Sequence, residues 1–134
     1  MKRATLNPEG VFRHPGFSRV TTLEGAMKLI LIAGQTPSDE NYRCVAPGDM
    51  RAQYLAVMNN LDIQLRAAGA TFADVVYRRT FVLDVDAYLK VATDLATPKF
   101  FDPDAMPGST MVGVTRLSHP DFLIEVDLLA AVGA

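Results

Sequence analysis

The sequence has few of the residues that cross-link small proteins or bind metals. Its single cysteine, Cys44, cannot form an internal disulfide, and no CxxC or Cys/His cluster offers the spacing of a structural zinc site. We therefore expect a reducing, cytoplasmic compartment. The two histidines, His14 and His119, lie in proline-containing stretches that have neither metal-ligand spacing nor the partners of a catalytic triad. No phosphate-binding loop or dinucleotide fingerprint is present.

Long apolar runs and clusters of basic residues are also missing. The longest strongly apolar run, 29–33, is far shorter than the ~18 residues of a membrane span. The first residues lack the apolar stretch of a signal peptide. The 13 basic residues are scattered within a net charge of −2, whereas nucleic-acid binding needs a clustered basic surface. We therefore expect neither a membrane nor a nucleic acid as a partner.

Apolar residues, in contrast, are plentiful for so small a protein. They make up 49% of the 134 residues, and the mean hydropathy is +0.14. A chain of this length can form one domain with a real core; we assign that domain to residues 1–134, with an irregular lead-in over 1–16. Some of the apolar side chains should remain on the surface, and an exposed apolar patch usually marks a partner surface. We therefore expect self-association.

Periodicity predicts five strands and two helices. Strand-like runs cover 17–23, 27–33, 73–83, 109–117 and 122–132. The short, glycine-containing connection between the first two strands suggests a hairpin. The order ββ-α-β-α-ββ predicts an α/β (α+β) sandwich, in which two helices cover one face of a sheet. The other face then needs a cover, which another subunit could supply.

The two predicted helices are amphipathic. The first begins with Asp49, a suitable N-cap, and ends before Gly69, a natural residue just beyond a helix. The second begins with Asp84 or Asp86 and ends before Pro98. Its apolar stripe comprises Tyr88, Val91, Ala92 and Leu95.

The last predicted strand carries a candidate for catalysis. Apolar residues alternate with a face that bears Glu125 and Asp127. Leu123 and Leu129 on that face would partly enclose Glu125, and partial burial near a second carboxylate raises a pKa toward the range of a general base. The alternative is a solvated strand face with two ordinary acids.

Two further segments offer groups that could bind a ligand. A Pro-Gly turn leads into a strand at residues 107–110, where backbone amides and the hydroxyls of Ser109 and Thr110 can bind an anion or an oxyanion. Phe17 and Arg19 are two residues apart on a predicted strand, so their side chains would share a face and could line a carboxylate pocket. The alternatives are an ordinary turn and a core phenylalanine beside an exposed arginine.

Several stretches, taken together, resemble the Rid family, also called the YjgF or L-PSP endoribonuclease-like family. They are IAGQT at 32–36, LRAAG at 65–69, FADVV at 72–76, FVLD at 81–84, PGST at 107–110 and LIEV at 123–126. The resemblance runs from about Pro15 to Val132. It implies a chorismate mutase-like fold and a homotrimer with clefts between subunits. It also implies hydrolysis of reactive enamines and imines to a ketone and ammonia, without a cofactor.

The resemblance also assigns roles to individual residues. Glu125 matches the glutamate that places the hydrolytic water, Gly34 matches a glycine whose backbone completes the pocket, and Ser109 matches the serine after a substrate-binding arginine. Gly108 stands where that arginine is found. Losing a charge-assisted hydrogen bond of about 1.5–3 kcal/mol should weaken binding of small anionic imines on the order of 10–100-fold. We therefore place the chain in an arginine-lacking branch.

Three other positions depart from the family pattern: Thr110 replaces a common cysteine, Ala33 a common serine and Phe17 a pocket tyrosine. Phe17 would still supply an aromatic wall. Gly108 would leave room for a substrate that is bulkier or not anionic, and Arg19 would replace the missing anion anchor.

These matches lead to one main expectation and two alternatives. The main expectation is a hydrolase or deaminase of an enamine, imine or related small metabolite, which is not the archetypal small 2-imino acid. The first alternative is a metabolite-binding or regulatory trimer without catalytic activity. The second is an L-PSP-type endoribonuclease or translation inhibitor, which the net charge of −2 makes less compatible.

Overall fold

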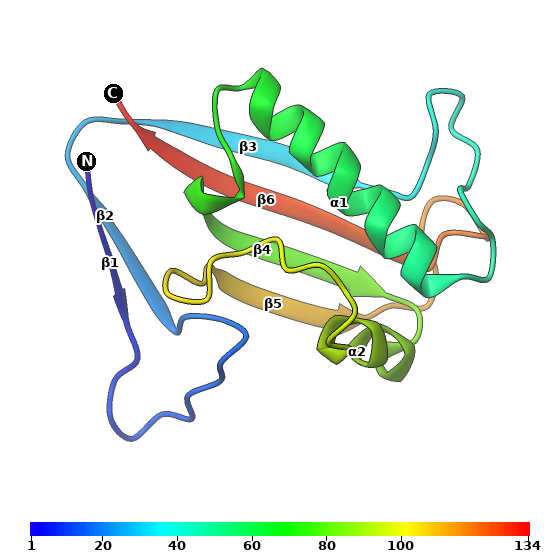
Figure 1. Cartoon of the computed structure of the whole chain (residues 1–134), viewed down its shortest axis with the longest axis horizontal. Coiled ribbons are helices and arrows are strands. Elements are labelled where there is room, and N and C mark those ends of the chain that lie inside the picture. Colours follow the sequence, from blue (N-terminus) through cyan, green and yellow to red (C-terminus); the bar gives the residue numbers. More distant parts are fainter.

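The computed structural model, which describes residues 1–134, contains a four-stranded mixed sheet with both helices on one of its faces (Figure 1). The strand order is β3-β6-β4-β5; β4 and β5 are parallel and the other neighbours are antiparallel. The elements are β1 (Lys2–Leu6), β2 (Val20–Glu24), β3 (Met27–Gln35), α1 (Met50–Ala67), the 3-10 turn η1 (Phe72–Asp74), β4 (Val75–Val82), α2 (Val85–Thr93), β5 (Gly108–Gly113) and β6 (Ile124–Gly133). This mixed α+β architecture confirms the predicted fold class.

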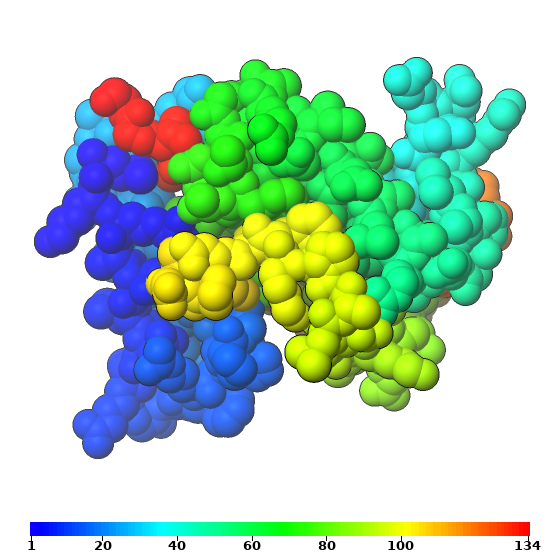
Figure 2. All heavy atoms as spheres, viewed as in Figure 1, coloured from blue at the N-terminus to red at the C-terminus, as the bar shows by residue number.

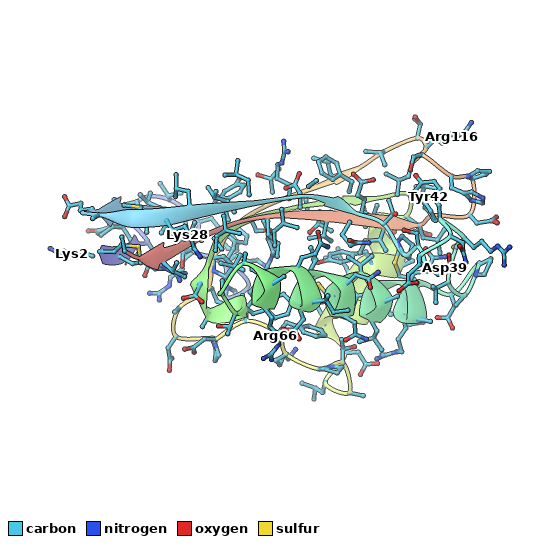
Figure 3. The ribbon with its side chains drawn as sticks, turned by 90° about the horizontal axis from the view of Figure 1, so that it is seen from above. Lys2, Lys28, Asp39, Tyr42, Arg66 and Arg116 are labelled. Atoms are coloured by element: carbon cyan, nitrogen blue, oxygen red, sulfur yellow. The ribbon has the colours of Figure 1, made fainter.

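Strand β6 separates the two faces of the sheet by the alternation that its sequence predicts. Ile124, Val126 and Leu128 are buried with the apolar side of α1 in one core. Glu125 and Asp127 are half-buried on the face turned away from the helices. Figure 3 shows both helices beneath the sheet and none on the other face. Figure 2 shows how closely α1 and the segment around residue 100, in yellow, cover the helix side.

The face turned away from the helices is partly apolar, and we call it the open face. Leu31 is 78% exposed there and Leu29 is 54% exposed, both on the edge strand β3. Tyr77 and Val112 are also exposed on this face. Part of the exposed apolar surface therefore lies where a second copy could cover it, although other exposed apolar side chains, such as Leu95, Phe12 and Ile63, are outside this face. No helix is long and apolar enough to cross a membrane, and no three His, Cys, Asp or Glu side chains gather as a metal site would require.

The predicted helix starts are confirmed, but the second helix is shorter than predicted. The Asp49 carboxylate accepts a hydrogen bond from the Ala52 amide, and Asp84 caps α2 in the same way. Helix α2 ends at Thr93 rather than near Thr97, because the chain turns at Asp94 and the Thr97 hydroxyl donates to the carbonyl of Val91 over 2.7 Å. Leu95 falls in that turn and is 93% exposed, so its assignment to the apolar stripe is wrong.

The N-terminal third differs most from the prediction. Strand β2 forms no hairpin with β3; it pairs antiparallel with β1, from Lys2 opposite Glu24 to Leu6 opposite Val20. This β1–β2 ribbon is a separate two-stranded sheet, so part of the expected irregular lead-in is a strand. Gly25, with φ of +93°, turns the chain from the ribbon into β3.

Candidate functional site

Glu125 lies on β6 beside an irregularity in the neighbouring strand. The register between β3 and β6 shifts between Ile32 and Gln35, which places Ala33 and Gly34 at a bulge. A Cβ atom added to Gly34 would lie 2.2 Å from Glu125 Oε2 and 2.9 Å from its Cδ. The carboxylate therefore rests directly on the backbone of Gly34, and any larger residue at position 34 would displace it.

The two carboxylates of the open face have different surroundings. Asp127 is held by Arg79, whose Nη2 lies 2.6 Å from Asp127 Oδ2 and whose Nε donates to both carboxylate oxygens over 3.0 and 3.1 Å. The hydrogen bond to Asp127 raises the pKa of the Arg79 guanidinium. The Glu125 side chain makes no hydrogen bond or ion pair within the chain. Asp127 is thus neutralised by Arg79, whereas the oxygens of Glu125 remain free to accept hydrogen bonds.

Gly108 does not leave the empty space that we expected. It lies opposite Tyr77 in the parallel β4–β5 register, and a Cβ atom at position 108 would lie 2.6 Å from Tyr77 Cδ2 and 2.9 Å from Cε2. The tyrosine ring therefore fills the volume that a side chain at 108 would take. Its hydroxyl forms a hydrogen bond with the hydroxyl of Thr110.

Ser109 and Thr110 point to opposite faces, because side chains alternate along a strand. Thr110 lies on the open face with Tyr77, whereas Ser109 lies opposite Arg78 on the helix side. The guanidinium of Arg78 stacks 4.4 Å from the ring centroid of Phe101, and burial lowers its pKa. The two hydroxyls of the Pro-Gly-Ser-Thr segment therefore do not converge on one ligand group within this chain.

Phe17 and Arg19 form the expected aromatic–guanidinium pair, but not on a strand. Residues 17–19 precede β2, and Ser18 holds this segment against the one before Gly108: its amide donates to the carbonyl of Pro107 over 3.1 Å. The Arg19 guanidinium carbon lies 5.0 Å from the centroid of the Phe17 ring. Arg19 Nε donates to the carbonyl of Phe12 over 2.7 Å.

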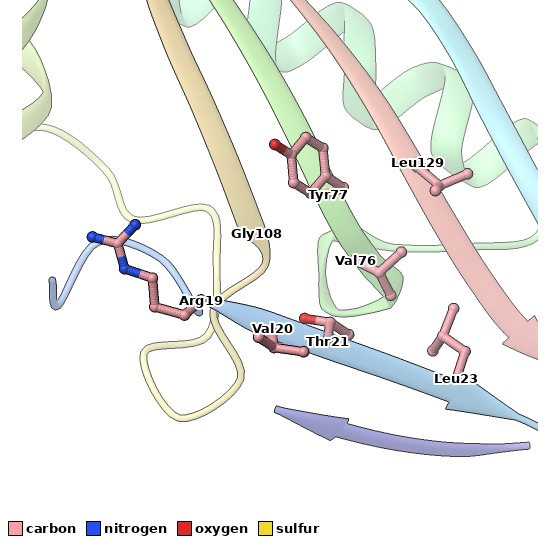
Figure 4. Close-up of a pocket in the computed structure, with 8 residues that line it drawn as sticks. All are labelled: Arg19, Val20, Thr21, Leu23, Val76, Tyr77, Gly108 and Leu129. Carbon is pink, nitrogen blue, oxygen red and sulfur yellow. The ribbon is translucent and has the colours of Figure 1, made fainter. Parts of the chain in front are cut away.

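A hollow of about 390 Å³ opens between β2 and the sheet, next to Gly108 (Figure 4). One end is apolar and contains Leu23, Val76 and Leu129, whereas the guanidinium of Arg19 points away from them. Its lining consists of Arg19, Val20, Thr21, Leu23, Val76, Tyr77, Gly108 and Leu129. The Pro-Gly-Ser-Thr segment thus adjoins a space suited to an apolar group.

The expected site residues form two separate groups within one chain. Glu125 lies opposite Phe81, and Phe81 lies opposite Val112, four residues beyond Gly108 on β5. With ~3.3 Å per residue and ~4.8 Å between strands, Glu125 and Gly108 are about 16 Å apart. The Glu125 group contains Ala33, Gly34 and Glu125, and the Gly108 group contains Phe17, Arg19, Gly108 and Thr110. No single small ligand can contact both groups of the same chain.

The two histidines and the cysteine have structural rather than catalytic contacts. His14 Nδ1 accepts a hydrogen bond from Gly16, and His119 Nδ1 accepts one from Asp121 two residues later, so each imidazole closes a turn. Burial, and to a lesser degree the charge of Asp121, raises the pKa of the Cys44 thiol, which makes it a poor nucleophile.

Comparison with known proteins agrees with this architecture. A family model described as endoribonuclease L-PSP matches residues 14–132. The chain belongs to the L-PSP family. An L-PSP relative from Pyrococcus horikoshii, named a RutC family protein, is 30% identical over 105 residues, which are 78% of this chain and 80% of that protein.

Two solved structures are also similar in fold to this L-PSP family member. A Yersinia pestis protein of the Rid family, described as of unknown function, is 32% identical, with a TM-score of 0.79 over 98% of this chain and all of that one. A Mycobacterium tuberculosis member of the YjgF/YER057c/UK114 family is 28% identical, with a TM-score of 0.60 over 98% and 100% of the two chains. The predicted membership of the Rid or YjgF family is thus confirmed.

Sequence reasoning missed the contribution of β4 to the open face of this L-PSP chain. Tyr77 and Arg79 lie beside Gly108 and Asp127 only because of the strand register. An aromatic residue and an arginine in a strand-like run gave no signal of their own. The contact between Tyr77 and Gly108 joins residues 31 positions apart, which no local pattern reveals.

Proposed function

We propose that this L-PSP family protein is a cofactor-independent hydrolase, which converts an enamine or imine to a carbonyl compound and ammonia in a cleft between the subunits of a homotrimer. The observation that carries the proposal is the free carboxylate of Glu125, half-buried on the open face and placed against the backbone of Gly34. A carboxylate with uncommitted lone pairs can orient a water molecule and accept its proton.

The reaction is a simple hydrolysis. Water adds to the carbon of the C=N bond while Glu125 accepts one of the water protons. That proton then passes to the nitrogen, which gives a carbinolamine. Glu125 next transfers the carbinolamine hydroxyl proton to the nitrogen, so the C–N bond breaks as the C=O bond forms, and ammonia leaves with both water protons. An enamine enters the same path after protonation at carbon gives the imine. The sum consumes one water and needs no oxidant or reductant.

The separation of the two residue groups favours a cleft that is shared between subunits. About 16 Å divides Glu125 from Gly108 within one chain, and the exposed Leu29 and Leu31 of the open face suit contact with another copy. In the trimer, the Glu125 group of one subunit would face the Gly108 group of its neighbour. The apolar open faces would then close a common core.

Within that cleft, we assign a role to each of the other site residues. Thr110 and the backbone around Gly34 and Gly108 hold a polar group of the substrate, with Ala33 at the edge of the same pocket. Phe17 forms an aromatic wall. Ser109 supports the 107–110 segment from the helix side of the sheet. Arg19 binds an anionic group located away from the reacting carbon; replacing it with alanine should weaken binding of carboxylate ligands.

The deciding experiment measures ammonia release from imines made in situ from a panel of amino acids and amino acid amides. Glu125→Gln keeps the size of the side chain but removes the proton acceptor, so turnover should be lost. The matched control is Glu40→Gln, because Glu40 is exposed in the loop between β3 and α1. Equal turnover by the Glu125→Gln variant and the wild-type protein would refute the catalytic role.

A binding or regulatory trimer is the second candidate, favoured by the absence of a cation at position 108. If the wild-type protein hydrolyses none of the imines, but the corresponding carbonyl compounds raise its melting temperature, it is a binding protein. Sedimentation equilibrium tests the assembly separately: a trimer has three times the mass of the 14.6-kDa chain.

A further inference from the structure

We infer that Asp127 is a positioning residue: it holds the guanidinium of Arg79 away from Glu125, so that the Glu125 carboxylate stays free to accept a proton. The inference rests on the proposed function, in which Glu125 accepts a proton from the attacking water. Asp127 acts on the reaction only through Arg79 and has no contact of its own with the reacting atoms.

The first step of the argument is the placement of the three charged side chains on one face. Asp127 lies directly opposite Arg79 in the antiparallel β4–β6 register, and Glu125 lies opposite Phe81, two residues farther along each strand. Side chains two residues apart on a strand share a face, so Arg79 and Glu125 are diagonal neighbours. Such neighbours are roughly 7–8 Å apart at Cα, a separation that a long side chain can span. Arg79 can therefore reach either carboxylate.

The second step is the present orientation of Arg79. Its Nε donates to the two carboxylate oxygens of Asp127 over 3.1 and 3.0 Å, and its Nη2 donates to Oδ2 over 2.6 Å. The guanidinium carbon also lies 5.7 Å from the centroid of the Phe81 ring, the residue opposite Glu125. The side chain thus already extends toward the strand position of Glu125, and its bonds to Asp127 hold it short of an ion pair there.

The third step is the balance of charge on the open face. Neither β3 nor β5 contributes a charge to that face; Lys28 of β3 lies on the helix side, bonded to the C-cap carbonyl of α1. Arg79 is therefore the only cation of the sheet on the open face, and two acids compete for it. The ionisable side chains of the four-stranded sheet on this face are Tyr77, Arg79, Glu125 and Asp127.

The Arg79–Asp127 pair protects Glu125 from two opposite effects. A guanidinium bound to Glu125 would favour its ionised form and occupy the lone pairs that accept the water proton. An unpaired Asp127 beside Glu125 would instead favour the protonated form of Glu125, which cannot act as a base. With the two charges of the pair bound to each other, neither effect acts on Glu125.

The pH profile of kcat for ammonia release separates the two effects. Asp127→Ala frees Arg79 to pair with Glu125, so kcat should fall by about 10–100-fold, the ratio for one charge-assisted hydrogen bond. The acidic limb of its profile should shift to lower pH. Arg79→Met leaves Asp127 unpaired, so its acidic limb should shift to higher pH. The double variant Arg79→Met/Asp127→Ala carries neither charge and should recover most of the kcat that Asp127→Ala loses.

Two further variants distinguish positioning from a structural role. Asp127→Glu keeps a charged partner for Arg79 and should retain more activity than Asp127→Ala. Asp62→Ala is the matched control, because it removes the acid of the exposed ion pair with Arg66 on α1, and its pH profile should equal that of the wild-type protein. The melting temperature and the sedimentation mass of every variant report whether it folds and assembles like the wild-type protein.

The NMR signal of the Arg79 Nε–H group tests the change of partner without any turnover. A carboxylate bound to this group slows its exchange with water. The signal should be present in the wild-type protein and in Glu125→Ala, where Asp127 binds Arg79. It should also persist in Asp127→Ala, where Glu125 takes over, and be lost in the double variant Asp127→Ala/Glu125→Ala.

Loss of this signal in Asp127→Ala alone would overturn the inference, because Arg79 would then turn to solvent rather than to Glu125. An unmoved acidic limb in Asp127→Ala would overturn it too, as would a kcat of Arg79→Met/Asp127→Ala no higher than that of Asp127→Ala. A wild-type protein without imine hydrolysis refutes the proposed catalysis, whereas the NMR series still decides whether the two acids compete for Arg79. The two failures are therefore distinguishable.

Discussion

Replacing Gly34 with alanine tests how strictly the chemistry depends on the position of Glu125. The new Cβ atom would lie 2.2 Å from Glu125 Oε2, about 1 Å inside normal van der Waals contact. Only the flexible end of the glutamate has to move, and Gly34 does not have a positive φ. The fold should therefore survive, with a decrease in Tm of less than about 5 °C, or roughly 1 kcal/mol. A displacement of about 1 Å at a reacting group lowers turnover by about 100-fold.

The assay is steady-state ammonia release with the best imine of the panel. The kcat of Gly34→Ala should be about 100-fold lower than that of the wild-type protein, with little change in KM, because the carboxylate acts on water rather than on substrate binding. Gly113→Ala is the matched control: its added Cβ meets Val85 Cγ2, 3.2 Å away, and the Val82 carbonyl, 3.9 Å away, and does not touch Glu125. Shortening the acid in the double variant Gly34→Ala/Glu125→Asp makes room for the methyl group. The decrease in kcat of the double variant should therefore be smaller than the product of the decreases in Gly34→Ala and Glu125→Asp. If Gly34→Ala retained wild-type turnover, the reasoning about the Glu125 position would be refuted.

Three further predictions concern stability and assembly. Gln53→Ala should lower the free energy of unfolding in urea by roughly 2–4 kcal/mol, because this fully buried amide accepts from the Leu123 amide and donates to the Asp121 carbonyl; a loss below about 1 kcal/mol would contradict that role. Burial raises the pKa of Tyr54 to about 12, above the usual ~10 of a tyrosine. The buried neutral phenol therefore makes its full contribution to the free energy of unfolding below pH ~10, and this contribution is lost as the pH rises toward 12. Ultraviolet titration should show one late-ionising phenol, which disappears in Tyr54→Phe. Leu31→Asp should lower the sedimentation mass, because it places a charge on the most exposed leucine of the open face; an unchanged mass would exclude this face from the assembly.

The parts of the fold that the sequence predicts well are those specified by local patterns. Asp49 and Asp84 can cap only the helices that follow them, and both do so. Gly69 has a φ of +81° just beyond α1, the conformation that favours glycine there. The alternation around Glu125 needs no partner strand to be recognised, so the two faces of β6 were predictable.

The parts that escaped prediction depend on contacts between distant segments. Lys2–Leu6 has no marked alternation and becomes a strand only because β2 lies beside it. The same pairing removes β2 from the expected hairpin. In the site, Glu125 was a candidate from the strand alternation as well as from the family resemblance, and Gly34 from the resemblance, but their direct contact depends on a bulge in β3. Tyr77 was overlooked because only the strand register places its ring over Gly108.

The β1–β2 ribbon has a consequence for how the hollow beside Gly108 responds to a ligand. Two paired strands alone are marginally stable in water, and the β1–β2 ribbon pairs with no strand of the larger sheet. Arg3 holds it to the body through hydrogen bonds to the carbonyls of Ala73 and Ala105. The ribbon can therefore open locally while the four-stranded sheet stays intact, and its amides should exchange with deuterium sooner than those of β6. Because the ribbon supplies one wall of the hollow, a bound ligand would restrain this opening, and slower exchange in β1 and β2 would report occupancy even for a compound that is never turned over.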